Sequence, residues 1–272
     1  MNMLPSELPY SKRADYVRGL IPLCLFYAWH RAQPGAPLAD ILNRQTHIYR
    51  LTTLRKGDSG AVQVVPASRN TRWKELLKEI EKIDRQCTNV KDFEGEAFRL
   101  LWPLAEQAIG RDVADWPWIP EGYCTRRLPG CQISGCFAWE SASEPATVSI
   151  HIANACMPQS PFNNLQHRII ELKAMVSRLK DSVPKHRYIK CNSWLNSFPP
   201  FLKLFPANWP RSQNVSAVGA SCNWWGQFMA RDGTFHRRHG EFLRSHMRFP
   251  WPAIDGICTI NELEAHLHEF LR

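Results

Sequence analysis

Residues Pro145 to Asn154 read PATVSIHIAN, and this stretch decides the fold class. Its β-branched residues alternate with small or polar ones, as in a strand that buries one face. The segment CQISGCFAWE, from Cys131 to Glu140, shows nearly the same alternation, and the turn-prone SASEP separates the two. We therefore predict an antiparallel hairpin.

A helix and a third strand are expected to follow the hairpin. Apolar residues recur at helical spacing from about Asn163 to Lys180. The segment HRYIKCNSWL then predicts a strand, and VSAVGASCNWWGQFMARDG, from Val215 to Gly233, predicts another that ends in the turn RDG. Thr259 and Glu262 have the spacing of a capping box, so a helix should close the chain.

The N-terminal part is predicted to be mostly helical. Four segments carry helical periodicity or helix-terminating residues: Ser11–Ala32, Pro37–Gly57, Thr71–Cys87 and Asp92–Gly110. The irregular stretch DWPWIPEG, from Asp115 to Gly122, is the expected boundary. The sequence predicts an α+β fold, with a helical part over residues 1–115 and a mostly antiparallel sheet with packed helices over 116–272. One continuous domain remains an alternative.

Composition favours a basic, cytoplasmic protein. The 272 residues carry a formal net charge of +9, and the nine cysteines lack paired CxxC spacing, which suggests reduced thiols. Acidic residues and prolines interrupt the first twenty positions, so we expect no signal peptide. The most apolar stretch, Leu20 to His30, is too short to cross a bilayer and predicts a buried helix, so no membrane span is expected.

His151 is the first candidate for chemistry, because none of the motifs GxSxG, GxxxxGK[ST], GxGxxG or HExxH is present. It lies inside a predicted strand between Ile150 and Ile152, whose side chains should point to the opposite face. A histidine held in this way can accept a proton from an amine or an alcohol. The alternative is a hydrogen-bonded structural histidine.

Polar residues at the strand ends extend this candidate site. If YIKC pairs beside SIHI, then Asn154, Asn192 and Ser193 come close to His151 and could hold a polar substrate. Alternatively, Asn192 and Ser193 form a turn that caps the next segment. Cys191 lies at the same join, but no activating partner is visible in the sequence.

The segment SCNWWGQF contains a second group of candidate residues. On a strand, Trp224 and Trp225 would point to opposite faces, so one of them could line a pocket together with Gln227. Packing in the core is the alternative for these tryptophans.

Histidines near the C-terminus raise the question of a metal. His236 and His239 are three residues apart and Glu241 follows, a set that could hold a non-haem iron ion. Arginines crowd this pair and would repel a cation, so a metal is not favoured.

The motif VSIHIANACMP is followed by a long helix, a strand ending in CNSWL and a proline-terminated apolar run. In the order of these elements, the region from Cys131 to Pro206 resembles the C-terminal domain of GNAT-like acyltransferases. The resemblance implies transfer of an acyl group from a thioester donor, acyl-coenzyme A, to an amine or hydroxyl. It also implies that His151 accepts the proton and that Ser193 and Trp194 shape the pocket. The segment QISGCF departs from the family's pyrophosphate loop, because phenylalanine replaces a small residue.

We therefore predict a cytosolic small-molecule enzyme, an acyltransferase of a biosynthetic type. The catalytic residues would be His151, Ser193 and Asn192, and the substrate-binding residues would be Asn154, Trp194, Trp224, Trp225 and Gln227. A metal-dependent oxygenase or hydrolase that uses the C-terminal histidines is one alternative. A noncatalytic protein that binds nucleic acid through its basic charge and tryptophans is another.

Overall fold

The structure, a computed structural model, describes residues 7–32, 35–55, 65–115, 118–119, 123–124, 132–182 and 185–270. The chain forms two compact units: Met1–Asp115 with Val218–Pro250, and Trp116–Ala217 with Trp251–Arg272. The sequence analysis assigned residues 218–250 to the second part, whereas they belong to the first unit. The α+β class is confirmed, because a helical N-terminal part is followed by a mixed sheet.

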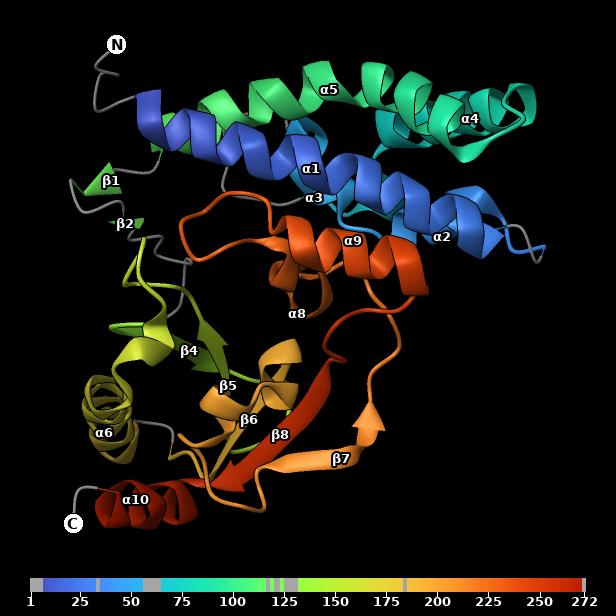
Figure 1. Cartoon of the computed structure of the whole chain (residues 1–272). Helices are drawn as coiled ribbons and strands as arrows, with labels where there is room; N and C mark the ends of the chain where they lie inside the picture. Colours follow the sequence, from blue (N-terminus) through green and yellow to red (C-terminus); the bar gives the residue numbers. More distant parts are fainter. Residues whose placement is uncertain are drawn as a thin grey trace. The chain divides into compact units, whose positions relative to one another are not determined.

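Helices build the described part of the first unit (Figure 1). They are α1 (Glu7–Ala32), α2 (Leu38–Arg44), α3 (Ile48–Leu51), α4 (Thr71–Gln86), α5 (Val90–Asp115), α8 (Cys222–Trp225) and α9 (Arg237–His246), with the short 3-10 helices η1 (Thr53–Arg55), η2 (Ala67–Arg69) and η5 (Gly226–Phe228). Helix α1 packs along α5, where the rings of Trp29 and Phe93 lie 5.1 Å apart. The predicted burial of residues 20–30 is confirmed for Leu20 to Ala28, of which only Pro22 retains appreciable exposure.

One predicted helix is divided in two. Within the segment predicted from Pro37 to Gly57, α2, α3 and η1 form, with a break at residues 45–47 between α2 and α3. The predicted terminator Gly57 lies outside the described residues. The buried Thr46 hydroxyl donates to the carbonyl of Leu42 at 2.6 Å, which satisfies an acceptor that the end of α2 would leave unpaired. The break places His47, at 7% exposure, at the start of α3.

The second unit is built on a six-stranded sheet in the order β3-β4-β5-β6-β8-β7. These strands are β3 (Gln132–Ser134), β4 (Phe137–Ser141), β5 (Thr147–Ile152), β6 (Tyr188–Ser193), β7 (Pro210–Val215) and β8 (Ile254–Thr259). A separate two-stranded sheet pairs β1 (Trp118–Ile119) with β2 (Tyr123–Cys124). The helical elements are α6 (Leu165–Asp181), α7 (Pro199–Leu202), α10 (Ile260–Glu269), η3 (Pro161–Asn163) and η4 (Trp194–Ser197).

Strands β4 and β5 form the predicted antiparallel hairpin. Strands β5 and β6 pair in parallel, with Ser149 opposite Lys190, which confirms that YIKC lies beside SIHI. A parallel pair needs a crossover connection, and α6 supplies it between these strands. The other neighbouring strands of the large sheet pair in the antiparallel direction.

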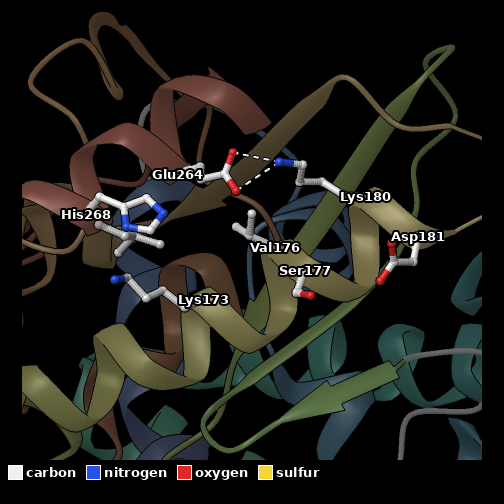
Figure 2. Close-up of a pocket in the computed structure, with 8 residues that line it drawn as sticks. Lys173, Val176, Ser177, Lys180, Asp181, Glu264 and His268 are labelled. Carbon is white, nitrogen blue, oxygen red and sulfur yellow. Dashed lines mark hydrogen bonds and ion pairs between the residues drawn. The ribbon is translucent and has the colours of Figure 1, made fainter.

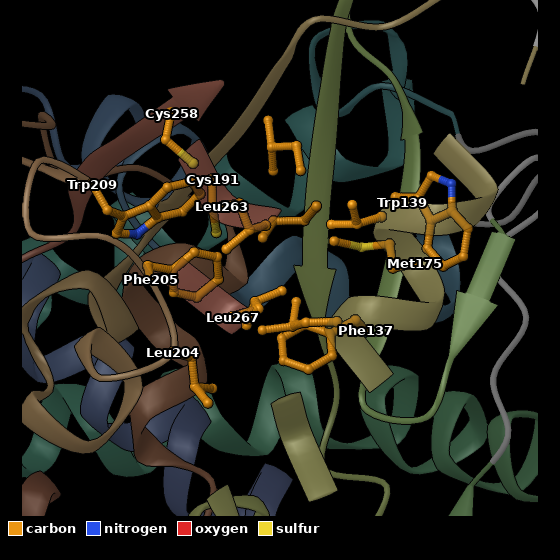
Figure 3. Close-up of a cluster of buried hydrophobic side chains, with 14 of the residues drawn as sticks. Phe137, Trp139, Met175, Cys191, Leu204, Phe205, Trp209, Cys258, Leu263 and Leu267 are labelled. Atoms are coloured by element: carbon orange, nitrogen blue, oxygen red, sulfur yellow. The ribbon is translucent and has the colours of Figure 1, made fainter. Parts of the chain in front are cut away.

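Helices α6 and α10 cover a core built on the sheet. Figure 3 shows its aromatic end, where Phe205 stacks on Trp209 with ring centroids 4.1 Å apart. The capping box predicted at Thr259 and Glu262 is confirmed, with the Glu262 N–H donating to the Thr259 hydroxyl at 3.1 Å. It fixes the start of α10 directly after β8.

The join after β6 is a hydrogen-bonded corner. The buried Asn196 amide donates to the carbonyls of Cys191 at 2.8 Å and Ile254 at 2.7 Å. Its carbonyl oxygen accepts the Trp209 indole N–H at 2.8 Å. One amide thus links β6, β8 and the aromatic core: both of its N–H hydrogens are donated, and its oxygen accepts a hydrogen bond.

The strand predicted in VSAVGASCNWWGQFMARDG, from Val215 to the turn that ends at Gly233, is wrong. Residues Cys222–Trp225 form the short helix α8 instead, and Gly226–Phe228 form η5. Strand β7 lies earlier, at Pro210–Val215, and β8 was not predicted. Among the described residues, no helix combines the length and apolar character needed to cross a membrane.

Gly256 provides a test of the core. A Cβ at this position would lie 2.3 Å from Cε2 of the fully buried Trp209. We expect Gly256→Ala to lower the free energy of unfolding by about 1–3 kcal/mol, because the indole has no space to move away. Urea denaturation followed by circular dichroism measures the change.

Gly110 supplies the matched control. It is exposed in α5, and a Cβ there would meet nothing within 4 Å. Gly110→Ala should stabilise the protein by up to about 1 kcal/mol, since alanine favours helix. An unchanged unfolding midpoint for Gly256→Ala would contradict the packing described for Trp209.

Candidate functional site

His47 is held in one orientation and one tautomer. Its Nδ1 lies 2.8 Å from the carbonyl oxygen of Ala220. A carbonyl oxygen only accepts hydrogen bonds, so Nδ1 carries the proton and donates it. In the neutral ring, the lone pair is therefore on Nε2, on the other side of the imidazole.

Cys222 lies on that other side. Its Sγ is 3.7 Å from Nε2 of His47, and the residue is exposed to solvent. A cysteine beside a histidine that a third group orients is the arrangement that activates a thiol nucleophile. Here the third group is the Ala220 carbonyl.

Trp225 joins the two segments that carry this pair. Its buried indole N–H lies 2.9 Å from the carbonyl of Gln45 and 3.1 Å from that of Gly219. Gln45 is two residues before His47, and Gly219 is three before Cys222. The shared donor therefore fixes the spacing of both backbones next to the site.

Core contacts hold Trp225 and His47 in place. The Trp225 ring packs against Phe228 at 5.6 Å and Phe249 at 5.1 Å between centroids. The Tyr27 hydroxyl donates to the Gln45 side chain at 3.1 Å, and a backbone hydrogen bond links His47 to the buried Cys24 thiol. The exposed thiol thus lies on a rigid support.

The surrounding charges favour the Cys222 thiolate. Desolvation by nearby protein atoms opposes ionisation, but the charge and hydrogen bond of His47 act against it. The guanidinium groups of Arg50 and Arg13 add to this effect, and together they lower the pKa of Cys222 from 9.0 to about 6. At neutral pH the residue is mainly the thiolate, which is the nucleophilic form of cysteine.

Burial keeps two neighbouring groups neutral. It raises the pKa of the Tyr16 hydroxyl and of the Cys24 thiol far above their usual range. Both residues lie on α1. Cys222 is therefore the group in this cluster that ionises readily.

His151 and Asn192 lie on one face of the second unit's sheet. Ser149 and Lys190 define that face by their register, because the residues that alternate with them are buried. His151 Nε2 lies 2.9 Å from Oε1 of Glu140, with both side chains more than 40% exposed. The Asn192 amide donates to Asp255 at 2.6 Å and to the Ser216 hydroxyl.

Ser193 lies on the opposite, buried face, so the structure does not bring it together with His151. Its hydroxyl accepts the Leu195 N–H at 3.2 Å and caps η4, as the capping alternative predicted. Trp194 packs beside Phe198 with centroids 6.1 Å apart. Asn154 accepts from the Cys156 N–H and donates to the Gln159 carbonyl, each at 2.9 Å. The catalytic and binding roles of these residues stay predictions.

Trp224, Trp225 and Gln227 lie in the core of the first unit. Both tryptophans are buried, so they do not project from the two faces of a strand. The Gln227 amide donates to the carbonyl of Trp224 at 2.8 Å. The two buried tryptophans anchor the short helix α8, which also contains Cys222, to the core of the first unit.

Nδ1 of each histidine in the predicted metal site is hydrogen-bonded to the backbone. His236 Nδ1 accepts the His239 N–H at 3.3 Å, and His239 Nδ1 donates to the Gln227 carbonyl at 2.7 Å. The two rings stack at 3.7 Å, burial lowers both pKa values, and Glu241 is exposed. No three His, Cys, Asp or Glu residues within the described ranges are grouped to hold a metal ion. The metal alternative stays a prediction.

A surface groove of 320 Å³ runs between α6 and α10 (Figure 2). Val176 and Leu267 contribute apolar surface, and Lys180 bridges to both carboxylate oxygens of Glu264 at 2.9 Å. The charged side chains that line the groove are at least partly exposed to solvent, and the ion pair between Lys180 and Glu264 spans the groove. The groove therefore offers no activated group comparable to Cys222.

In comparisons with known proteins, no family model matches the chain, and no curated sequence or solved structure shows significant similarity to it. The resemblance to GNAT-like acyltransferases stays a prediction.

The sequence analysis did not identify His47 or Cys222. It placed His47 inside a continuous helix and Cys222 on a strand, so neither appeared next to a partner. The available signal was the polar triplet Gln-Thr-His at residues 45–47, which interrupts the apolar pattern and whose threonine can cap a helix end.

Alkylation by iodoacetamide tests the state of Cys222. The rate at Cys222 should rise with a midpoint near pH 6 and level off above about pH 7, because only the thiolate reacts. His47→Asn keeps a donor for the Ala220 carbonyl but removes the imidazole, and should move the midpoint toward 9.0. Peptide mapping by mass spectrometry measures the extent of alkylation at each cysteine separately.

Cys87 is the control within the same unit. Burial and nearby acidic residues raise the pKa of its thiol, so its alkylation should still be rising at pH 9. A wild-type midpoint above pH 8 at Cys222, or an unchanged midpoint in His47→Asn, would contradict the proposed pairing.

Proposed function

We propose that this protein is an acyltransferase that carries the acyl group on Cys222 as a thioester. The observation that carries the proposal is the exposed Cys222 thiol, 3.7 Å from a histidine whose tautomer the Ala220 carbonyl fixes. A thiolate attacks the carbonyl carbon of a thioester readily, because the bond that forms and the bond that breaks are alike.

In the first step, the Cys222 thiolate attacks the acyl carbonyl of the donor. A carbon–sulfur bond forms to Cys222 and the carbon–sulfur bond to the donor breaks. The departing thiolate takes from Nε2 of His47 the proton that the Cys222 thiol gave up when it became the thiolate. The enzyme is left acylated and the donor is released as a thiol. His47 is then neutral, with its lone pair on Nε2.

In the second step, an amine or hydroxyl attacks the acyl-Cys222 carbonyl. His47 Nε2 accepts the proton of the attacking group, which is the role of a general base within hydrogen-bond reach. The carbon–sulfur bond to Cys222 breaks, and the thiolate and the protonated histidine are restored. Water in place of the acceptor would give hydrolysis.

Positive charge near Cys222 supports an anionic donor. Arg50 is exposed, and Arg50 and Arg13 both act electrostatically on the thiol. Acyl-coenzyme A, the donor that the resemblance implies, carries phosphates that such charges attract. The same charges stabilise the oxyanion of the tetrahedral intermediate.

The proposal keeps the reaction expected from the resemblance and moves it to different residues. His151, paired with Glu140, is the alternative proton acceptor. The two assignments differ in whether a covalent acyl-cysteine forms.

Intact-mass analysis after incubation with acetyl- and longer acyl-coenzyme A tests the proposal. We expect one acyl group on Cys222, removable by hydroxylamine, and no adduct in Cys222→Ala. His47→Asn should slow acylation by at least about 100-fold, the usual contribution of an acid–base group.

His151→Asn and Cys87→Ala are the matched controls and should acylate at the wild-type rate. Acyl transfer that survives in Cys222→Ala and is lost in His151→Asn would refute the Cys222 assignment and support His151. Absence of any adduct or turnover with every donor would refute the proposed function.

A further inference from the structure

Two neighbouring cysteines, Cys136 and Cys156, lie in the second unit and have no part in the proposed acyl transfer. Cys136 precedes β4, and Cys156 follows β5. The β4–β5 register pairs Phe137 with Ile152, which brings these strand ends together. The two Sγ atoms are 3.9 Å apart.

One buried guanidinium contacts both sulfurs. Nη1 of Arg168, from α6, lies 2.6 Å from Sγ of Cys136 and 2.8 Å from Sγ of Cys156. The residue is only 4% exposed, and its Nε has no hydrogen-bond partner among the described residues. A buried charge is costly unless it is paired, and Nη2 of Arg168 has a carboxylate partner in Glu171. Nη1 of the same guanidinium is the nitrogen that contacts the two sulfurs.

Glu171 fixes this guanidinium. Its Oε1 lies 2.9 Å from Nη2 of Arg168, and its Oε2 accepts the Cys136 N–H at 3.0 Å. Gly135 makes room for the carboxylate, since a Cβ there would lie 1.9 Å from Oε1, and its φ of +56° favours glycine. Glu171 therefore ties the position of Arg168 to the backbone that carries Cys136.

The two thiols differ in access. Cys136 is 1% exposed, whereas Cys156 is partly exposed and can meet a small solute. Burial raises the pKa of Cys136 to about 12, although the Ala155 N–H and Arg168 act against it. Cys136 is therefore a protonated thiol, and Cys156 is the sulfur that solvent reaches beside a fixed positive charge.

We infer that Cys136 and Cys156 form a redox-active pair that hydrogen peroxide oxidises to a disulfide, with Cys156 the sulfur that reacts first and Arg168 the positive group that contacts both sulfurs. The Cys156 thiolate attacks one peroxide oxygen, the O–O bond breaks, and the departing hydroxide takes a proton to become water. Cys156 is then a sulfenic acid. Cys136 attacks that sulfur, the S–S bond forms, the S–O bond breaks, and the hydroxide leaves as water with the Cys136 proton.

The net reaction consumes two thiols and one peroxide and yields one disulfide and two water molecules. Two electrons pass from the sulfurs to the peroxide, and a dithiol reductant returns the pair to the reduced state. In the oxidised form, Arg168 would face one disulfide in place of the two separate thiols that it contacts in the reduced form. The site is thus a reversible modification site in the second unit.

The test treats the full chain with hydrogen peroxide, blocks free thiols with N-ethylmaleimide and maps the peptides without reduction. No lysine or arginine lies between the two cysteines, so chymotrypsin, which cuts after Phe137 and Trp139, is used. We expect a Cys136–Cys156 crosslink that dithiothreitol removes. A crosslink through Cys131, or peroxide consumption without a crosslink, would overturn the inference.

Cysteine-to-serine variants separate the roles of the two sulfurs, because each replacement removes the sulfur but changes the side-chain volume little. Cys136→Ser should accumulate a sulfenic acid at Cys156, which dimedone labels, whereas Cys156→Ser should give neither crosslink nor label at Cys136. Label at Cys136 in Cys156→Ser would overturn the assigned order. Cys87→Ser is the control and should form the crosslink as the wild type does.

Arg168→Gln tests the positive charge. We expect labelling of Cys156 in the Cys136→Ser background to slow by about tenfold or more, since a guanidinium in contact with the reacting sulfur stabilises negative charge in the transition state. Arg168→Lys keeps the charge and should react at a rate between the two. An unchanged rate in Arg168→Gln would show that the guanidinium does not activate Cys156.

Discussion

The donation of one buried N–H to two carbonyls is the interaction on which the candidate site depends. Trp225 provides it, and its acceptors at Gln45 and Gly219 belong to segments that the chain brings together from opposite ends of the first unit. A buried indole N–H that lost these acceptors would bear the full cost of desolvation, about 1–3 kcal/mol. The need to satisfy this donor therefore fixes the position of the segment that carries His47 relative to the segment that carries Cys222.

The same constraint explains why His47 acts on Cys222 alone. Once Nδ1 donates to the Ala220 carbonyl, the ring can rotate only by breaking that bond, and Nε2 stays directed at the thiol. His47 is buried, whereas the residue Cys222 is exposed to solvent. The protein thus positions the base rigidly while leaving the nucleophile open to a substrate, as catalysis by positioned groups requires.

The two cysteine sites show how the surroundings determine the chemistry of a thiol. Cys222 is exposed and next to a histidine that can exchange a proton, so it suits a cycle in which a leaving group must be protonated. Cys136 and Cys156 lie beside an arginine, which keeps its proton at any ordinary pH and offers only charge. Such a pair suits electron transfer between sulfur and an oxidant.

Local patterns predicted the parts of the fold that depend on neighbouring residues. The amphipathic stripe of α4, the capping box at Thr259 and the alternation in β5 are set within a few residues, and the structure contains all three. The pairing of YIKC beside SIHI entered the sequence argument only as a condition for the candidate site, and its parallel direction was not predicted. That direction requires the crossover that α6 supplies.

The candidate site could not be predicted in this way, because its residues are far apart in the chain. His47 and Cys222 are separated by 175 positions, and the break at Thr46 and the short helix α8 depend on tertiary contacts with Trp225 and the core. Strand β8 was missed for a related reason. Its sequence IDGICT contains a glycine that weakens strand propensity, and that glycine is needed only because Trp209 packs against it.

The most direct test of the account is the ionisation of Cys222 in Trp225→Phe, measured from the pH dependence of thiolate absorbance against the Cys222→Ala background. Phenylalanine retains much of the buried ring but has no N–H to donate. Trp73→Phe is the matched control, because Trp73 is an equally buried tryptophan whose N–H donates to the Asn43 side chain at 3.2 Å and not to the carbonyls of Gln45 and Gly219. We predict that the pKa of Cys222 rises toward 9.0 in Trp225→Phe and stays near 6 in Trp73→Phe. A folded Trp225→Phe protein that keeps a pKa near 6 would contradict the claim that this indole holds the pair together.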